Sequence, residues 1–152
     1  MKHFAPYALL LLFTAISLTG FSQNGNTAKP KQFNNFPDII NCSETTLNNI
    51  FNSAAGQHID LSFSDNFSFS GNVTSNVVKY SNLQTAVVRS PYFNNSIFSV
   101  SKIINADRTV SYLGRIINKN YFDGYELKKN TDGNYQLIKM ETDRVIQDCN
   151  QL

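Results

Sequence analysis

Residues 58–69, HIDLSFSDNFSF, alternate apolar and polar side chains on either side of an Asp-Asn turn. An alternation with a period of two places every second side chain on the same face of a strand. This stretch therefore predicts two antiparallel strands joined by a tight turn. We expect Phe67 and Phe69 to share a buried face with Val73 and Val77, and Gly71 between them to mark a bulge or a bend.

The same pattern continues through the rest of the chain. Short apolar runs alternate with turn residues such as Asp123-Gly124 and Asp132-Gly133, which gives seven or eight short strands. Short connections favour antiparallel neighbours, because parallel strands need a long crossover. We predict a mainly β (α+β) fold: one short N-terminal helix packed on a seven- to eight-stranded antiparallel meander, as an open sheet or a small barrel. The expected last strand is Arg144 to Cys149.

The helix is expected between Ser43 and Ala55, with Asn41 or Ser43 as its N-cap and Gly56 at its end. Four apolar residues at helical spacing form its expected buried face: Leu47, Ile50, Phe51 and Ala54. No other segment after residue 22 has this period, so we expect a single helix there.

Residues 1–22, MKHFAPYALLLLFTAISLTGFS, are typical of a cleavable signal peptide. Lys2 and His3 precede an uncharged apolar run, and the small residues Gly20 and Ser22 stand at the positions that favour cleavage before Gln23. The run is about 14 residues long, whereas a membrane-spanning helix needs roughly 20. We expect a secreted or periplasmic protein, with a polar, disordered leader over 23–32 and a single β-rich domain over 33–152.

The charges are nearly balanced. Without Lys2 the chain has 12 Lys and Arg against 11 Asp and Glu, a net charge of +1. This balance argues against a nucleic acid as partner, and no later segment is apolar enough for a membrane span in the mature chain. Charges of both signs alternate between Lys102 and Arg144, which we interpret as a solvated sheet face.

Two cysteines, Cys42 and Cys149, remain after residue 22. In an oxidising compartment they are expected to form one disulfide, with two free thiols as the alternative. Together with the single remaining histidine, His58, they cannot fill a tetrahedral zinc site. We expect no metal site and no cofactor.

The sequence carries no motif for an activated nucleophile, and most of its aspartates fall in turns, where turn geometry explains them. We therefore expect a non-catalytic protein. A hydrolase that uses carboxylate or Asn side chains is the enzyme hypothesis left open.

Two pairs of adjacent aromatic residues lie at expected strand ends: Tyr92-Phe93 after Pro91, and Tyr121-Phe122 before Asp123. Because loops on a rigid sheet often carry binding residues, we predict that these four rings form the contact surface for a protein or a glycan partner. The competing interpretation is that the rings fill the core beneath the loops.

Two alternative functions remain. One is a small barrel that carries an apolar ligand in a cavity lined by Phe63, Phe69 and Val87. The other is a pro-domain-like inhibitor of a secreted protease.

Overall fold

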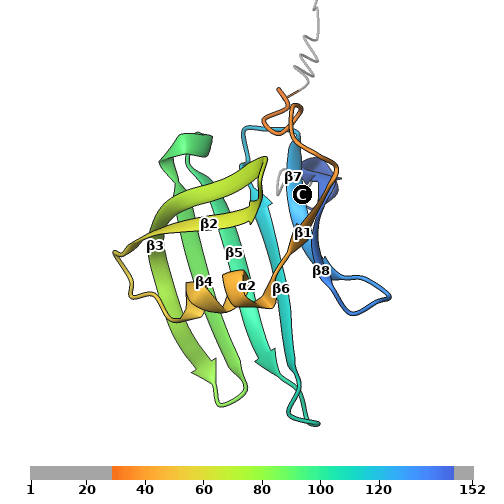
Figure 1. Cartoon of the computed structure of the whole chain (residues 1–152). Helices are drawn as coiled ribbons and strands as arrows, with labels where there is room; N and C mark the ends of the chain where they lie inside the picture. The colour runs from red at the N-terminus through yellow and green to blue at the C-terminus, as the bar shows by residue number, and fades with distance from the viewer. Residues whose placement is uncertain (1–28, 146–152) are drawn as a thin grey trace, which may run out of the picture.

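The computed structural model of the chain describes residues 29–145, which form an eight-stranded sheet curved around one α-helix (Figure 1). The elements follow in the order β1 (Ile39–Cys42), α2 (Glu44–Phe51), β2 (His58–Ser64), β3 (Phe67–Tyr80), β4 (Leu83–Ser90), η1 (Pro91–Phe93), β5 (Ser96–Ile104), β6 (Val110–Ile117), β7 (Asp123–Lys129), β8 (Tyr135–Glu141) and η2 (Thr142–Arg144).

The strands form an antiparallel meander from β2 to β8, and β1 then pairs with β8. The two end strands, β1 and β2, lie near each other, but no ladder joins them within residues 29–145. The sheet is thus a nearly closed barrel, and the predicted mainly β fold is confirmed. The short strand β1 was not predicted, because its four residues show too little alternation to be recognised.

Inward-facing side chains fill the barrel. Ala86 and Val88 on β4 and Phe98 and Val100 on β5 are all 1% exposed or less. Large rings complete the interior: Phe33, Phe67, Phe69, Tyr125 and Tyr135 are almost fully buried. Phe63 and Phe69 are buried as expected, whereas Val87 lies on the outer face, so its assignment to the interior was wrong.

A bulge in β3 reverses the side-chain pattern halfway along the strand. Val73 pairs with Val88, but the next partners are Ser75 and Val87, so one extra residue stands on β3. A one-residue shift moves each following side chain to the opposite face. Val77 is therefore 49% exposed. The prediction that it shares the buried face of Phe67 was wrong. The bulge lies three residues beyond Gly71, the position at which the sequence indicated it.

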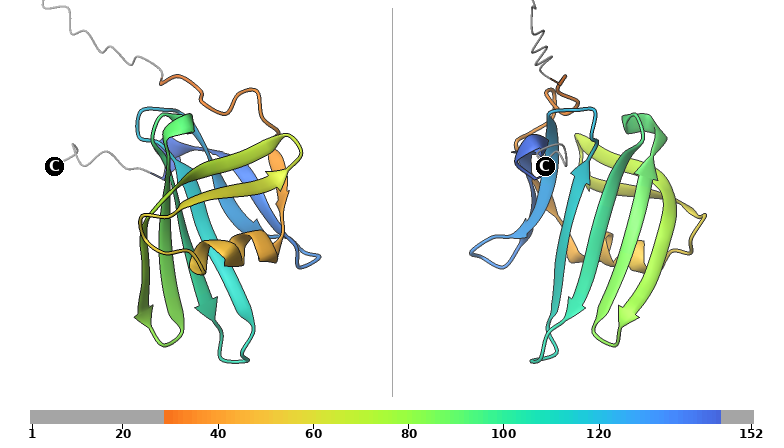
Figure 2. Two further views of the ribbon diagram at one scale, coloured as in Figure 1. Left: turned by 60° about the vertical axis from the view of Figure 1, so that its left-hand side comes forward. Right: turned by 180° about the vertical axis from the view of Figure 1, so that it is seen from behind.

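The helix α2 lies across the concave side of the sheet in both views of Figure 2. The side chain of Ser43 accepts a hydrogen bond from the Thr46 amide at 3.0 Å, which makes Ser43 the N-cap. Leu47, Ile50 and Phe51 are buried, as predicted. Ala54 is exposed, contrary to the prediction, because the helix ends three residues earlier.

Two side chains of the sheet bind the C-terminal end of α2. The Nδ2 group of Asn76 donates to the carbonyl oxygens of Phe51 and Ser53 at 3.0 and 2.8 Å, and Gln84 Nε2 donates to Phe51 at 3.3 Å. The last carbonyls of a helix have no partner within it. Asn76 and Gln84 satisfy these carbonyls and fix the helix in the barrel.

The N-terminal segment closes one end of the barrel. Phe33 is fully buried, and its ring lies 5.2 Å from the ring of Tyr125 and 5.4 Å from that of Phe93. The backbone of the preceding residues also contacts the barrel, since Pro30 accepts a hydrogen bond from the Phe122 amide at 2.9 Å. Residues 29–32, the described part of the expected leader, thus lie on this end.

The other helical elements of the described residues are short. Besides α2, the described residues contain two 3-10 helices, η1 and η2. Arg144, the first residue of the expected last strand, ends η2, and residues 146–149 of that strand lie outside the described residues. None of the helices in residues 29–145 is long and apolar enough to cross a membrane.

Cys42 faces the interior from β1 and is 7% exposed. Burial raises the pKa of its thiol to about 12, so the free thiol would react very slowly at neutral pH. Cys149 lies outside the described residues, and the disulfide between them stays a prediction.

Replacing Phe51 with alanine should lower the free energy of unfolding by roughly 3–5 kcal/mol, because the ring is buried and packs against that of Tyr112. Denaturant unfolding measures this change. Asn52→Ala, at the exposed residue directly after the same helix, is the matched control and should cost far less. A Phe51→Ala variant as stable as the wild type would contradict the packing described above.

If Cys42 and Cys149 form the predicted disulfide, neither of them has a free thiol in the exported protein. The protein is unfolded in denaturant containing an alkylating reagent and no reductant, because the buried Cys42 would escape labelling in the folded state. An intact mass without added alkyl groups is expected, and reduction should then expose two thiols. Two alkyl groups before reduction would rule the bond out.

Candidate functional site

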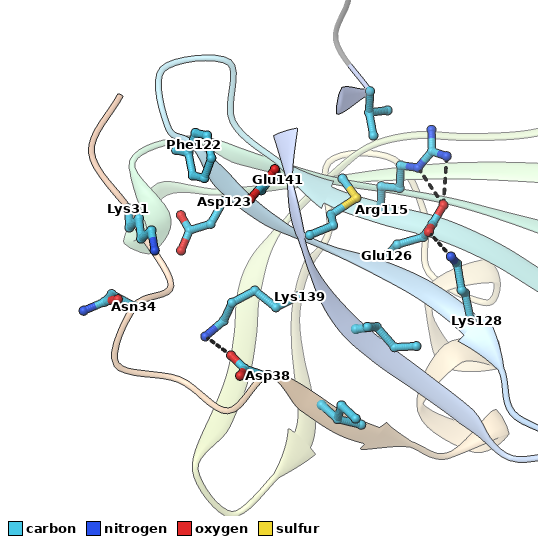
Figure 3. Close-up of a pocket in the computed structure, with 14 residues that line it drawn as sticks. Lys31, Asn34, Asp38, Arg115, Phe122, Asp123, Glu126, Lys128, Lys139 and Glu141 are labelled. Atoms are coloured by element: carbon cyan, nitrogen blue, oxygen red, sulfur yellow. Dashed lines mark hydrogen bonds and ion pairs between the residues drawn. The ribbon is translucent and has the colours of Figure 1, made fainter. Parts of the chain in front are cut away.

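The outer face of β1, β8, β7 and β6 is hollowed into a groove of about 890 Å³ (Figure 3). Ile39, Ile138 and Met140 form its apolar part, and Ile39 and Ile138 are cross-strand partners. Ile39 is 56% exposed. Residues of the N-terminal segment, such as Lys31 and Asn34, border the groove at the closed end of the barrel.

Three charged side chains form one wall. Arg115 and Glu126 are cross-strand partners on β6 and β7, and their side chains meet at 2.8 Å between Nη2 and Oε1. Lys128, two residues further on β7, binds the other oxygen of Glu126 at 2.6 Å. Lys128 and Arg115 hold the pKa of the Glu126 carboxyl below its ordinary value. The carboxyl is therefore ionised and held between two cations.

A second ion pair lies where the N-terminal segment enters β1. The Nζ group of Lys139 lies 2.8 Å from Asp38 Oδ1 and donates to the carbonyl oxygen of Phe36 at 2.7 Å. Lys139 also lowers the pKa of the Asp38 carboxyl. This lysine thus ties the N-terminal segment to β8.

Asp123 is buried at the closed end, with 3% of its surface exposed. Its two carboxylate oxygens accept hydrogen bonds from the amides of Gln32 and Phe33 at 2.6 and 2.9 Å. These bonds hold the N-terminal segment at the edge of the groove. Gly124 follows on β7, where a Cβ would lie 2.4 Å from the carbonyl oxygen of Ile116, so only glycine fits.

The groove displays fixed charges. The carboxylates of Asp38 and Glu126 are held in ion pairs, and that of Asp123 binds backbone amides. Within residues 29–145 no cluster of three or more His, Cys, Asp and Glu side chains could hold a metal ion.

The structure brings together the two loops that carry the predicted aromatic pairs. Asn118 Nδ2 in the β6–β7 loop donates to the carbonyl oxygen of Asn94, directly after η1, at 2.9 Å. The four rings do not form one surface, however. Tyr92 is 72% exposed, whereas the Phe93 ring stacks against Phe69 with the ring centres 5.6 Å apart.

The two rings of the second pair, Tyr121 and Phe122, are both half-buried. Of the four rings, Phe122 is the one that lines the groove. Of the four rings, Phe93 is the one that packs against the core, as the competing interpretation expected.

Sequence reasoning did not identify the groove. The alternating charges from Lys102 to Arg144 were interpreted as a solvated sheet face, and Arg115, Glu126 and Lys128 belong to that stretch. Their opposite signs at cross-strand positions were the available signal. It could be recognised only once the register of β6 and β7 was known.

Comparisons with known proteins give no relative for this chain: no family model, no curated protein and no solved structure matches it.

Asp123→Asn should release the N-terminal segment from the barrel. The amide side chain puts an N–H group opposite a backbone N–H, which leaves a buried donor unpaired and costs roughly 1–3 kcal/mol. Hydrogen exchange should show faster exchange at Gln32 and Phe33. Asp132→Asn, in the exposed β7–β8 turn, is the control. Unchanged protection of both amides would contradict this role.

Proposed function

We propose that this chain is an exported, non-catalytic binding domain, and that its groove holds an extended segment of a protein partner. The single observation behind the proposal is the combination of an exposed apolar floor with charged side chains fixed on the groove wall. Export itself rests on the sequence of residues 1–22, which lie outside the described residues.

The size and shape of the groove support this proposal. Ligand sites are typically concave, with volumes of roughly 300–1,000 Å³ and a few polar groups placed around apolar side chains. The groove has a volume of about 890 Å³ and is open along one side of the sheet. Ile39 and Met140 offer apolar contacts beside the ion pairs of Arg115 and Lys139.

A polypeptide segment fits these surroundings better than a sugar chain does. It supplies apolar side chains for Ile39 and Met140 together with charged groups of either sign for the wall. The ion pairs around Glu126 are already formed, so binding loses little side-chain entropy at this wall. A sugar chain has no large apolar group to match the floor.

Of the four predicted aromatic residues, two remain in the proposal. Phe122 lines the groove, and Tyr92 is exposed on the loop that Asn118 links to the β6–β7 loop. The next ring, Phe93, packs among other rings of the core and anchors the backbone beside Tyr92. A tyrosine offers a large contact area with few rotatable bonds.

The packing of the interior favours this function over the carrier of an apolar ligand. Phe63, Phe69 and their neighbours occupy the space that such a ligand would need. Nothing observed in residues 29–145 specifically favours the other alternative, a pro-domain-like inhibitor of a secreted protease.

A peptide display library and a glycan array, both probed with the purified protein, test the proposal. Selected peptides are expected to bind the wild type about tenfold more tightly than the Ile39→Ser variant, because the smaller side chain removes apolar contact. Val78→Ser is the matched control: Val78 is 67% exposed and lies outside the groove. Binding to glycans alone, or peptide binding that Ile39→Ser leaves unchanged, would refute the proposed partner.

A further inference from the structure

The charged wall of the groove carries more hydrogen-bond donors than its one carboxylate uses (Figure 3). The guanidinium group of Arg115 has five N–H groups. Those on Nε and Nη2 donate to Glu126 Oε1 at 3.2 and 2.8 Å. The ammonium group of Lys128 binds Glu126 Oε2 at 2.6 Å and keeps further N–H groups. Arg115 and Lys128 bind no second acceptor within residues 29–145, so donors remain for a group from outside.

The same wall carries a surplus positive charge. Arg115 and Lys128 are two cations around the single carboxylate of Glu126, which leaves a net charge of +1. The side chains of Arg115 and Lys128 are 45% and 56% exposed, whereas that of Glu126 is 24% exposed. A group that approaches from solvent therefore meets the cations more readily than the carboxylate. Such a wall attracts a second carboxylate and repels a cationic side chain.

The other acidic side chains around the groove leave this surplus in place. Asp38 is paired with Lys139, and Asp123 is buried against backbone amides. Glu141 is the cross-strand partner of Asp123, three residues before Glu126 on β7. The two glutamates are thus about 10 Å apart along the strands, a distance over which salt screens much of the interaction between exposed charges.

A row of cross-strand partners connects the charged wall to the apolar floor. Glu126 on β7 pairs with Ile138 on β8, and Ile138 pairs with Ile39 on β1. Neighbouring strands lie about 4.8 Å apart, so the middle of the Ile138–Ile39 pair is about 7 Å from Glu126. Two side chains on the same face of an extended chain have nearly this spacing, about 6.8 Å. A segment that crosses these strands can therefore place one side chain on the wall and the next but one on the floor.

We infer that the partner segment carries an acidic side chain two residues away from a large apolar one. The acidic side chain binds Arg115 and Lys128, and the apolar side chain packs on Ile39 and Ile138. This inference rests on the proposed function and names the chemistry of the partner, an acidic extended peptide. Arg115 selects the acid, because a guanidinium group binds a carboxylate through several N–H groups in a fixed geometry.

Two peptide libraries with random flanking residues test this inference. One is built around the cores Leu-Ala-Glu and Glu-Ala-Leu, and the other around Leu-Ala-Gln and Gln-Ala-Leu. The purified protein is expected to select from the first library. The tightest selected peptide should lose about five- to tenfold in affinity when its core glutamate is replaced by glutamine. The affinity of the glutamate peptide should also fall as salt is added, because ions screen exposed charges.

Two variants of the wall should change this affinity in opposite directions. Arg115→Gln removes the surplus charge together with its donors and should weaken binding of the glutamate peptide about tenfold. Glu126→Gln raises the surplus from one charge to two and should strengthen binding about fivefold. If the three side chains only stabilised the sheet, both variants would bind more weakly. Both should melt close to the wild type, because exposed ion pairs contribute little to stability.

Each variant has a control that changes the net charge by the same amount outside the groove. Lys79→Gln matches Arg115→Gln, and Asp132→Asn matches Glu126→Gln. Both control positions are exposed, and neither lines the groove. Both controls should bind the glutamate peptide as the wild type does. Changes as large as those of the wall variants would overturn the inference, because the overall charge of the protein would then explain them.

The chain itself offers a competing segment. Residues 146–148, Ile-Gln-Asp, have the inferred pattern and directly follow Val145, which lines the groove. Residues 146–152 lie outside the described residues. The predicted disulfide would draw this segment towards Cys42, which faces the interior, and so leave the groove to a partner. If Asp148→Asn strengthens peptide binding more than tenfold, the chain's own segment is the natural occupant and the inference is overturned.

The inference and the proposed function can fail separately. Equal affinity for the glutamate and glutamine peptides, with both weakened by Ile39→Ser, would overturn the acidic partner and keep the groove as a peptide site. Wall variants that change the affinity in the same direction would have the same consequence. If no peptide from either library binds at concentrations up to about 1 mM, the proposed function itself is refuted, and the inference fails with it.

Discussion

The packing of α2 inside the barrel depends on one side-chain amide, that of Asn76. Its Nδ2 group lies within 3.4 Å of the carbonyl oxygens of Ile50, Phe51 and Ser53, and its Oδ1 atom accepts a bond from Gln84. In a regular strand Asn76 would face solvent with Asn72, but the bulge after Val73 turns it inward. The same bulge turns Val77 outward. A single extra residue thus fixes the helix on one side of the sheet and creates an exposed apolar surface on the other.

Periodicity predicted most of the barrel, because most of its strands bury one face only. The alternation from Ile59 to Phe69 places Leu61, Phe63, Phe67 and Phe69 in the core, as the structure has them. The helix was predicted, and Ser43 was one of the two N-caps that the sequence offered, the other being Asn41; the capping bond between Ser43 and Thr46 is local. The bulge and β1 could not be predicted in this way. Each depends on partners far away in the sequence, such as Val88 for β3 and Leu137 for β1.

The candidate site was much harder to predict than the fold. Its wall pairs Arg115 with Glu126, and Lys139 binds Asp38, 101 residues earlier in the chain. Such pairs cannot be recognised before the strand order is known. The aromatic pairs showed a further limit. Adjacent rings at a strand end have different surroundings, so Phe93 fills the core while Tyr92 remains in solvent. A rule about loop aromatics cannot distinguish the two, because only the packing of Phe33 and Phe69 around Phe93 does so.

The ion pair between Lys29 and Asp143 has a consequence for the architecture of larger proteins. It shows that the first and the last described parts of the chain leave the barrel side by side, at the end that Phe33 closes. A domain whose entry and exit points are adjacent can be spliced into a surface loop of another protein without stretching either chain. The hairpin tips at the opposite end would then project away from the host. This barrel is therefore suited, by its connectivity alone, to serve as an inserted module.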